Sequence, residues 1–489
     1  MRARTAQLAL ACLVLGCGGT EAPPPPRVGL PFDLTRPEAG DPVSAEELTR
    51  VTDAYLDLLE AIRYFDFIDQ RSIGWPVSDP EGRYWYGSWW SGVNVVRTGQ
   101  SVVFTHPDDG SDNNGLRTGP MLEGACYTLA LAPSPARERH VRKLVRGFSS
   151  WIMAMERTST STLPVMLTRA AYPKSVEYDE GPLHIRIDYD NNHPGVDSGA
   201  SEYVLLPDNP HWGELWVKNK RSKDDLGHMI RALAQLEACG PMLSEEGRRD
   251  LDQALARYRA FAQQVEADGF RIATYDRTRQ VWIPIESLAI LVQEVNAECD
   301  AILTMRLLGH GDPGTWACGN GITDADQIIS QINDHARHIF WSFHHAAAHW
   351  AITSGAHDVG RELLLGLGTR NDETLDRLER QDPPGQYNAH DFSGFMAHSA
   401  NAGLPLTWRE VRFLHQRIQE AHDAYTAEAA ADAYRVLDPD GPDGTFHVEP
   451  ASHGFNFREL GVPLGSCVSP RRNPAGKPLL DCDRVRARL

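Results

Sequence analysis

Five histidines lie within residues 333–349, the densest group of titratable side chains in the chain. Because successive residues of an α-helix are turned by about 100°, four of them would share a face about 80° wide. These four are His335, His338, His345 and His349. The pair His345 and His349, at i and i+4, could bind one divalent metal ion if another helix supplied a third ligand. Alternatively, His345 could transfer protons as a general acid or base, or the face could line a hydrated cavity without catalysis.

A second group of titratable residues lies at 218–228. Asp224 and Asp225 are adjacent, close to several basic residues, and His228 follows three residues later. Two neighbouring carboxylates can form an acid/base pair, because repulsion between their charges raises the pKa of one of them. An acidic pair is also common in the first turn of a helix, where it stabilises the free amides. Both interpretations stay open for these residues.

Aromatic residues suggest a surface for sugars. The segment 83–92 holds five aromatic side chains among glycines and serines, and flat rings of this kind stack on the apolar faces of sugars. The predicted substrate-binding residues are Trp85, Trp89, Trp90 and Trp341. A small aromatic core under a loop would explain the segment equally well. Glu123, on a predicted helix, is a candidate proton donor for glycoside hydrolysis.

The run Asp188–Pro194 contains the sequence Asn-Asn-His. This run resembles a motif of alginate-lyase-like polysaccharide lyases, which are built on an (α/α) toroid. The resemblance implies that Asn192 neutralises a substrate carboxylate and that His193 removes the proton beside it. A turn that uses Asn and Asp in left-handed conformations is the alternative.

The first residues of the chain are basic, then apolar, and end in Val14-Leu15-Gly16-Cys17. This pattern resembles a bacterial lipoprotein signal, which implies cleavage of residues 1–16 and a lipid on Cys17. The apolar run is shorter than the roughly 20 residues that span a bilayer. We therefore expect a protein of the cell envelope, held to the membrane only by its N-terminal lipid and facing the periplasm or the cell exterior. Residues 17–42, which are rich in proline, would be the tether.

Once Cys12 is removed with the signal and Cys17 carries the lipid, six cysteines remain, an even number that favours disulfides in an exported protein. Two pairs would close short loops, and the third follows by elimination. The predicted pairs are Cys299–Cys318, Cys467–Cys482 and Cys126–Cys239. Buried free thiols are the alternative.

The net charge of −18 makes nucleic acid an improbable partner. The sequence contains no Walker loop, dinucleotide fingerprint, His-Glu-x-x-His or Gly-x-Ser-x-Gly motif. No cofactor is firmly implied, although the histidine pair leaves a divalent metal possible.

Apolar residues at alternating spacings of three and four predict a mainly α-helical protein. Ser44 and Glu47 form a predicted capping box for the first helix, and Thr407 and Glu410 form another. Segments 71–106 and 160–220 favour strands. We expect an (α/α) toroid-like array of helical hairpins over residues 43–437, with β-containing insertions, and a loop-rich, disulfide-stapled tail over 438–489.

These features favour a carbohydrate-active enzyme, either a polysaccharide lyase or a glycoside hydrolase, that acts on a poly- or oligosaccharide. Two alternatives belong to other classes. One is a metal-dependent hydrolase or oxygenase that uses the histidine helix, and the other is a surface lipoprotein that binds glycans without catalysis.

Overall fold

The structure is a computed structural model, in which helices account for 64% of the described residues. The prediction of a mainly helical protein is therefore confirmed. The described residues are 29–62, 64, 72–73, 88–89, 93–105, 114–158, 165–168, 171–173, 175–188, 203–218, 223–276, 281–287, 295–314, 334–380, 389–428, 440–448, 453–472 and 476–489.

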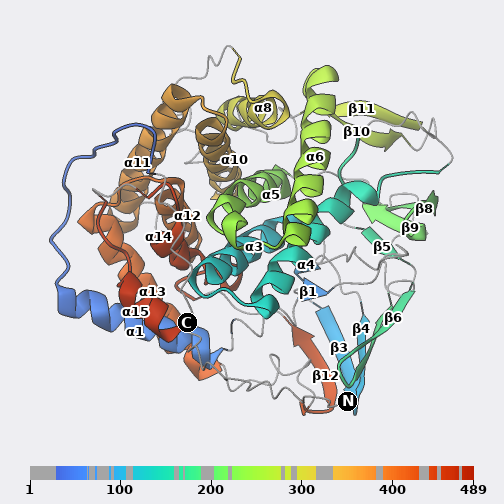
Figure 1. Ribbon diagram of the computed structural model, residues 1–489, viewed down its shortest axis with the longest axis horizontal. Helices are drawn as coiled ribbons and strands as arrows, with labels where there is room; N and C mark the ends of the chain where they lie inside the picture. Colours follow the sequence, from blue (N-terminus) through green and yellow to red (C-terminus); the bar gives the residue numbers. More distant parts are fainter. Residues whose placement is uncertain are drawn as a thin grey trace, which may run out of the picture.

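Four helices lie at the centre of the molecule, and we call them the central helices (Figure 1). They are α3 (Asn114–Leu131), α5 (Lys223–Gln235), α10 (Asp334–Thr353) and α12 (Ala389–Ala402). In this order, each helix packs against the next.

The central helices run in the same direction. At the start of α3 and α5, the amide of Leu116 donates to Asp225. About two turns further along each helix, Arg231 donates to Glu123. The pairing continues from α5 to α10 and from α10 to α12. The pairs are Gly227 with Ser342, Gln235 with His349, Trp341 with Phe395, and His345 with Ser399. The N-terminal ends of all four helices therefore lie at one end of the molecule, and their C-terminal ends at the other.

Close approach between central helices depends on glycine. A Cβ atom added at Gly227 of α5 would lie 2.7 Å from the Cβ of Ser342 on α10, well inside van der Waals contact. Because glycine has no side chain, the two backbones can pack this closely.

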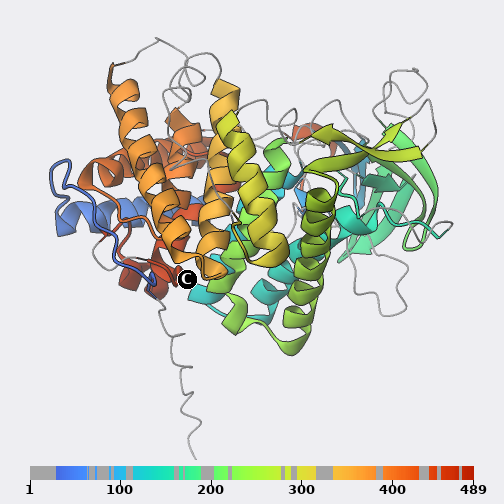
Figure 2. The same ribbon diagram turned by 90° about the horizontal axis from the view of Figure 1, so that it is seen from above.

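Six helices surround the central ones (Figure 1). They are α1 (Ala45–Ala61), α4 (Pro135–Met153), α6 (Glu245–Ala267), α8 (Val295–His310), α11 (His357–Arg380) and α13 (Trp408–Glu428). Short turns at 132–134, 354–356 and 403–407 join three of the central helices to the outer helices that follow them, so these pairs are helical hairpins. Figure 2 shows the same helices from a perpendicular direction.

Both predicted capping boxes lie at helix starts. The Ser44 hydroxyl accepts a hydrogen bond from the Glu47 amide at 3.1 Å. At the start of α13, the Thr407 amide donates to Glu410 at 2.7 Å, and the Glu410 amide donates back to the Thr407 hydroxyl at 3.3 Å. These contacts satisfy amides that the helix itself leaves without acceptors.

The strands lie to one side of the helices (Figure 1). Strands β1 to β9 lie in the two regions where the sequence predicts strands, whereas β10, β11 and β12 lie outside them. A five-stranded sheet has the order β12-β3-β4-β7-β6, and a three-stranded sheet has the order β5-β9-β8. Two further antiparallel pairs, β1 with β2 and β10 with β11, complete the described strands. Their bounds are β1 (Ser72–Ile73), β2 (Ser88–Trp89), β3 (Val93–Thr98), β4 (Ser101–Thr105), β5 (Ala171–Pro173), β6 (Ser175–Glu180), β7 (Leu183–Asp188), β8 (Tyr203–Asn209), β9 (Gly213–Lys218), β10 (Arg271–Asp276), β11 (Val281–Ser287) and β12 (Gly444–Val448).

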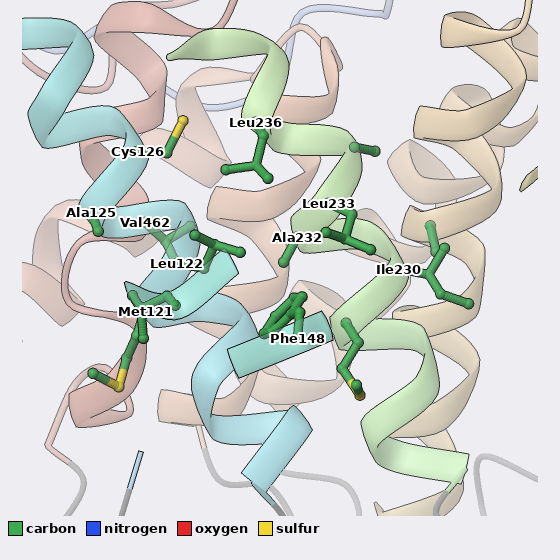
Figure 3. Close-up of a cluster of buried hydrophobic side chains, with 14 of the residues drawn as sticks. Met121, Leu122, Ala125, Cys126, Phe148, Ile230, Ala232, Leu233, Leu236 and Val462 are labelled. Carbon is green, nitrogen blue, oxygen red and sulfur yellow. The ribbon is translucent and has the colours of Figure 1, made fainter. Parts of the chain in front are cut away.

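Residues 453–472 and 476–489, which we call the C-terminal segment, contribute buried residues to the core. Its short helices η4 (Phe457–Glu459), η5 (Val462–Leu464) and α14 (Gly465–Val468) pack against α3, and η5 and α14 also contact α12. Val462 is completely buried and lies in the same apolar cluster as residues of α3, α4 and α5 (Figure 3). The last helix, α15 (Cys482–Arg488), contacts α1.

Two predicted disulfides are confirmed. Cys126 of α3 is bonded to Cys239, which follows the short helix η1 (Leu236–Ala238) after α5, and Cys467 of α14 is bonded to Cys482 of α15. Cys299 is also disulfide-bonded, but its predicted partner Cys318 lies outside the described residues.

Within the described part of the chain, none of the helices combines the length and the apolar character that crossing a membrane requires.

Candidate functional site

A network of charged side chains lies between the central helices. Arg231 of α5 donates from Nε to Oε1 of Glu123 on α3 at 2.9 Å, and both side chains are completely buried. Burial alone would raise the pKa of Glu123, but the charges of Arg231 and His398 outweigh it and leave the pKa below its usual value. Glu123 is therefore ionised, and it is unsuited to the role of proton donor that the sequence suggests for it.

His398 of α12 joins this network to the C-terminal segment. Its Nδ1 lies 2.9 Å from Oε2 of Glu123, and its Nε2 lies 3.9 Å from Oε1 of Glu459. Glu459 itself is 1% exposed and accepts from Asn456 at 3.3 Å. One buried imidazole thus lies between two carboxylates that come from distant parts of the chain.

Asp225 and His228, two predicted catalytic residues, are at the edge of this network. The Nδ1 atom of His228 lies 3.0 Å from Nη2 of Arg231, and its side chain is completely buried. Asp225 accepts from the amide of Leu116 at 2.6 Å, so it stabilises the first turn of α3. Asp224 lies in the first turn of α5, and its side chain is outside the described part.

His345 is also buried, at the contact between α10 and α12. Its Nδ1 lies 2.7 Å from the carbonyl oxygen of Trp341, and its Nε2 lies 2.9 Å from the Ser399 hydroxyl. Burial and the positive charge of Arg231 hold the pKa of His345 well below its usual value, so the imidazole is neutral. Trp341 is completely buried against Phe395, with ring centroids 5.0 Å apart.

His349, the other half of the predicted metal pair, is held by protein groups on both ring nitrogens. Arg471 approaches Nδ1 at 2.7 Å, and Gln235 approaches Nε2. Burial and the charge of Arg471 hold the pKa of His349 well below its usual value. Arg471 also pairs with Glu237, so it links the C-terminal segment to the end of α5.

Among the described residues, no three His, Cys, Asp or Glu side chains are placed to hold a metal ion together. A metal at His349 would have to displace either Arg471 from Nδ1 or Gln235 from Nε2. His335 and His338 lie in α10 as predicted, but their side chains are not described. His344 points to the other side of the helix, as predicted, and lies 2.9 Å from buried Asp300 of α8.

The structure thus brings together Asp225, His228, His345 and Trp341 from the predicted set. The network has additional members that the sequence does not reveal, because each is separated from its partner by between 61 and 275 residues; they are Arg231, His398 and Glu459. Only the spacing of His228 and Arg231, three apart on one helix, gives a local signal. Asn192, His193, Trp85, Trp90 and Cys17 lie outside the described residues, as does the side chain of Trp89.

Two surface depressions are formed by described residues. One, of about 910 Å³, follows α1 from Ser44 to Asp57 and reaches His422. The other, of about 370 Å³, lies between 311–313 and 354–359. Neither contains a residue of the buried network.

Comparison of the chain with protein-family models, with curated proteins and with solved structures finds no match.

Proposed function

We propose that this protein is an exported, lipid-anchored carbohydrate-active enzyme, a polysaccharide lyase or a glycoside hydrolase, built on an (α/α) toroid-like array. The proposed array has the parallel central helices inside and the outer helices around them. The C-terminal segment supports this arrangement, since it contacts both α12 and α3 and so bridges the first and last central helices.

The observation that carries the proposal is the gathering of Glu123, Arg231, His228, His345 and His398 between the central helices. Groups with shifted pKa values, buried and in contact with charged partners, concentrate at functional sites. In this network the pKa values of Glu123 and His345 are both lowered, so both groups are without their proton and can act as proton acceptors. We place the reaction at the N-terminal end of the central helices, where Asp225 and His228 lie at the edge of the buried network.

A second candidate function has its own support. Every described member of the predicted catalytic set is at most 3% exposed and is engaged by protein groups. Such a network can serve stability alone, and the protein would then bind surface glycans without cleaving them.

The test is a panel of neutral and uronate-containing polysaccharides incubated with the purified, lipidated full-length protein. Elimination would produce the ultraviolet absorbance of an unsaturated uronate, whereas hydrolysis would produce reducing ends without it. We expect one of these signals, and we expect its loss in His228→Gln with an unchanged circular dichroism spectrum. The matched control is His310→Gln, on the exposed end of outer helix α8. Binding without any product would support the second candidate and end the enzymatic proposal.

A further inference from the structure

Residues 29–44, which we call the N-terminal arm, lie along the body of the protein. Leu34 is 1% exposed. The side chain of Arg36, 6% exposed, donates to Glu410 at 2.6 Å, to Asp372 at 3.1 Å and to the carbonyl oxygen of Gly368 at 3.1 Å. Because charge-assisted bonds to a buried carboxylate are strong, the arm is fixed to α11 and α13.

More of the arm is held in the same way. Glu38 pairs with Lys477 of the C-terminal segment, and the amide of Arg409 donates to the carbonyl oxygen of Ala39 at 3.0 Å. The Arg412 guanidinium donates to the carbonyl oxygens of Asp41 and Pro42 at 2.8 and 2.7 Å. Figure 1 shows the arm, in blue, passing beside α11 before it enters α1. Half of the residues 17–42 that the sequence assigns to a tether, those from residue 30 onward, are docked on the body.

The beginning of the arm lies at the C-terminal end of the central helices. A Cβ atom at Gly403, in the turn after α12, would lie 2.7 Å from the side chain of Leu30. The ring of Phe32 lies 6.4 Å from that of His357, the first residue of α11. Both contacts are in turns that follow central helices, at the end opposite to the N-terminal ends of α3, α5, α10 and α12.

The chain between the proposed lipid and the arm is short. Cys17 and Gly29 are twelve residues apart, so a fully extended chain would span about 40 Å. Helix α11, with 24 residues, is about 35 Å long. A tether that ran along the whole body would therefore have to be almost fully extended, which costs conformational entropy, whereas a tether that points away from the body carries no such cost.

We propose that the face made by the turns 132–134, 239–244, 354–356 and 403–407 is turned toward the membrane leaflet that carries the lipid, and that the N-terminal ends of the central helices face away from it. This inference rests on the lipid anchor of the proposed function. Because the arm is docked, the lipid would fix the orientation of the body as well as its attachment, and the end of the molecule that carries Asp225 and His228 would face away from the membrane.

The experiment compares the distances of the two ends of α11 from the membrane in the lipidated full-length protein. Asp358→Cys and Arg380→Cys, both at exposed positions near opposite ends of α11, are each labelled with a donor fluorophore. The protein is reconstituted into phosphatidylethanolamine and phosphatidylglycerol vesicles that contain an acceptor-labelled lipid. We expect energy transfer to be several-fold more efficient from position 358 than from position 380. Equal efficiencies, or the reverse order, would overturn the orientation.

The anchor and the orientation can fail separately. Incorporation of labelled palmitate, lost in Cys17→Ser, tests the anchor alone. Without incorporation, the anchor and this inference both fail, whereas incorporation with equal energy transfer rejects only the orientation. Glycan cleavage is measured independently of both.

A pair of variants tests whether the arm causes the orientation. Arg36→Ala removes the bonds to Glu410 and Asp372, so the arm is released and the difference between positions 358 and 380 shrinks. Arg249→Ala, which removes an exposed pair on α6, leaves the difference unchanged. Twenty glycine and serine residues inserted before Gly29 lengthen the tether without touching the arm, and they also reduce the difference. An unchanged difference in both the arginine variant and the insertion would overturn the role of the arm.

Discussion

The central helices and the contact between α15 and α1 both use arginines to bind carboxylates. Arg231 and Glu123 have no exposed side-chain surface, whereas Arg488 is 32% exposed and its partners Asp57 and Glu60 are 55% and 79% exposed. Each region also contains one disulfide. Removing one partner of such an arginine–carboxylate pair therefore costs a different amount of stability in the two regions, because water solvates the remaining charge at the surface but not between the central helices.

The largest difference is expected from Arg231→Ala. It would leave the ionised Glu123 buried without its guanidinium, at a cost of about 3–5 kcal/mol in the free energy of unfolding. Urea unfolding measures this cost. The matched double variant, Arg231→Met with Glu123→Gln, removes both charges and should recover most of the stability. A loss below about 1 kcal/mol for the single variant would mean that burial does not determine how much the Arg231–Glu123 pair contributes to the free energy of unfolding.

The two disulfides sharpen the comparison. Cys126 and Cys239 are separated by 113 residues, whereas Cys467 and Cys482 are separated by 15. The entropy of loop closure predicts that replacing the first pair with alanine costs about 1.8 kcal/mol more than replacing the second. Denaturant unfolding of the two double variants checks this order. Equal costs would indicate that the unfolded chain already holds α3 and α5 together.

Acid should affect the interior through His349. Burial and Arg471 hold the pKa of His349 well below the usual value of about 6.5. At a pH below about 6.5, the unfolded chain is therefore protonated at His349, whereas the folded protein is not. Stability is therefore lost as pH falls, by on the order of 1.4 kcal/mol per pH unit for this histidine. His349→Gln should flatten the dependence of the unfolding free energy between pH 6.5 and pH 5. An unaltered slope in this variant would contradict the assignment.

The smallest effect is expected at the surface. Arg488→Ala should change the free energy of unfolding by at most about 0.5 kcal/mol, because water solvates Asp57 and Glu60 once the arginine is gone. Added salt should reduce even this difference. A cost near that of Arg231→Ala would remove the contrast between the two regions.

Much of the local structure follows from the sequence. The capping boxes at Ser44 and Thr407, the amphipathic helices and the strand over 183–188 are set by neighbouring residues, so a short window contains the whole signal. The cysteine pairs 467–482 and 126–239 are also predictable, since an even number of cysteines leaves few choices once short loops are closed. The packing of the C-terminal segment against α3 and α12 cannot be predicted in this way, because its buried residues do not recur at a regular spacing.

The candidate site divides in the same way. His345 and His349 are seen to share a helix face from their spacing, and His344 is seen to point elsewhere. That Asp225 also accepts from the amide of Leu116 at the start of α3 depends on a partner 109 residues away.

The sequence by itself determined that the chain is mainly helical, where α1 and α13 begin, and that Cys126 pairs with Cys239 and Cys467 with Cys482. Only the tertiary structure decided that Glu123, Arg231, His398 and Glu459 form one buried network, and that the arm begins at the C-terminal end of the central helices. The physical reason is the separation along the chain over which each interaction acts. Capping and periodicity act over a few residues, whereas the free energy of a charge depends on every element that excludes water from it.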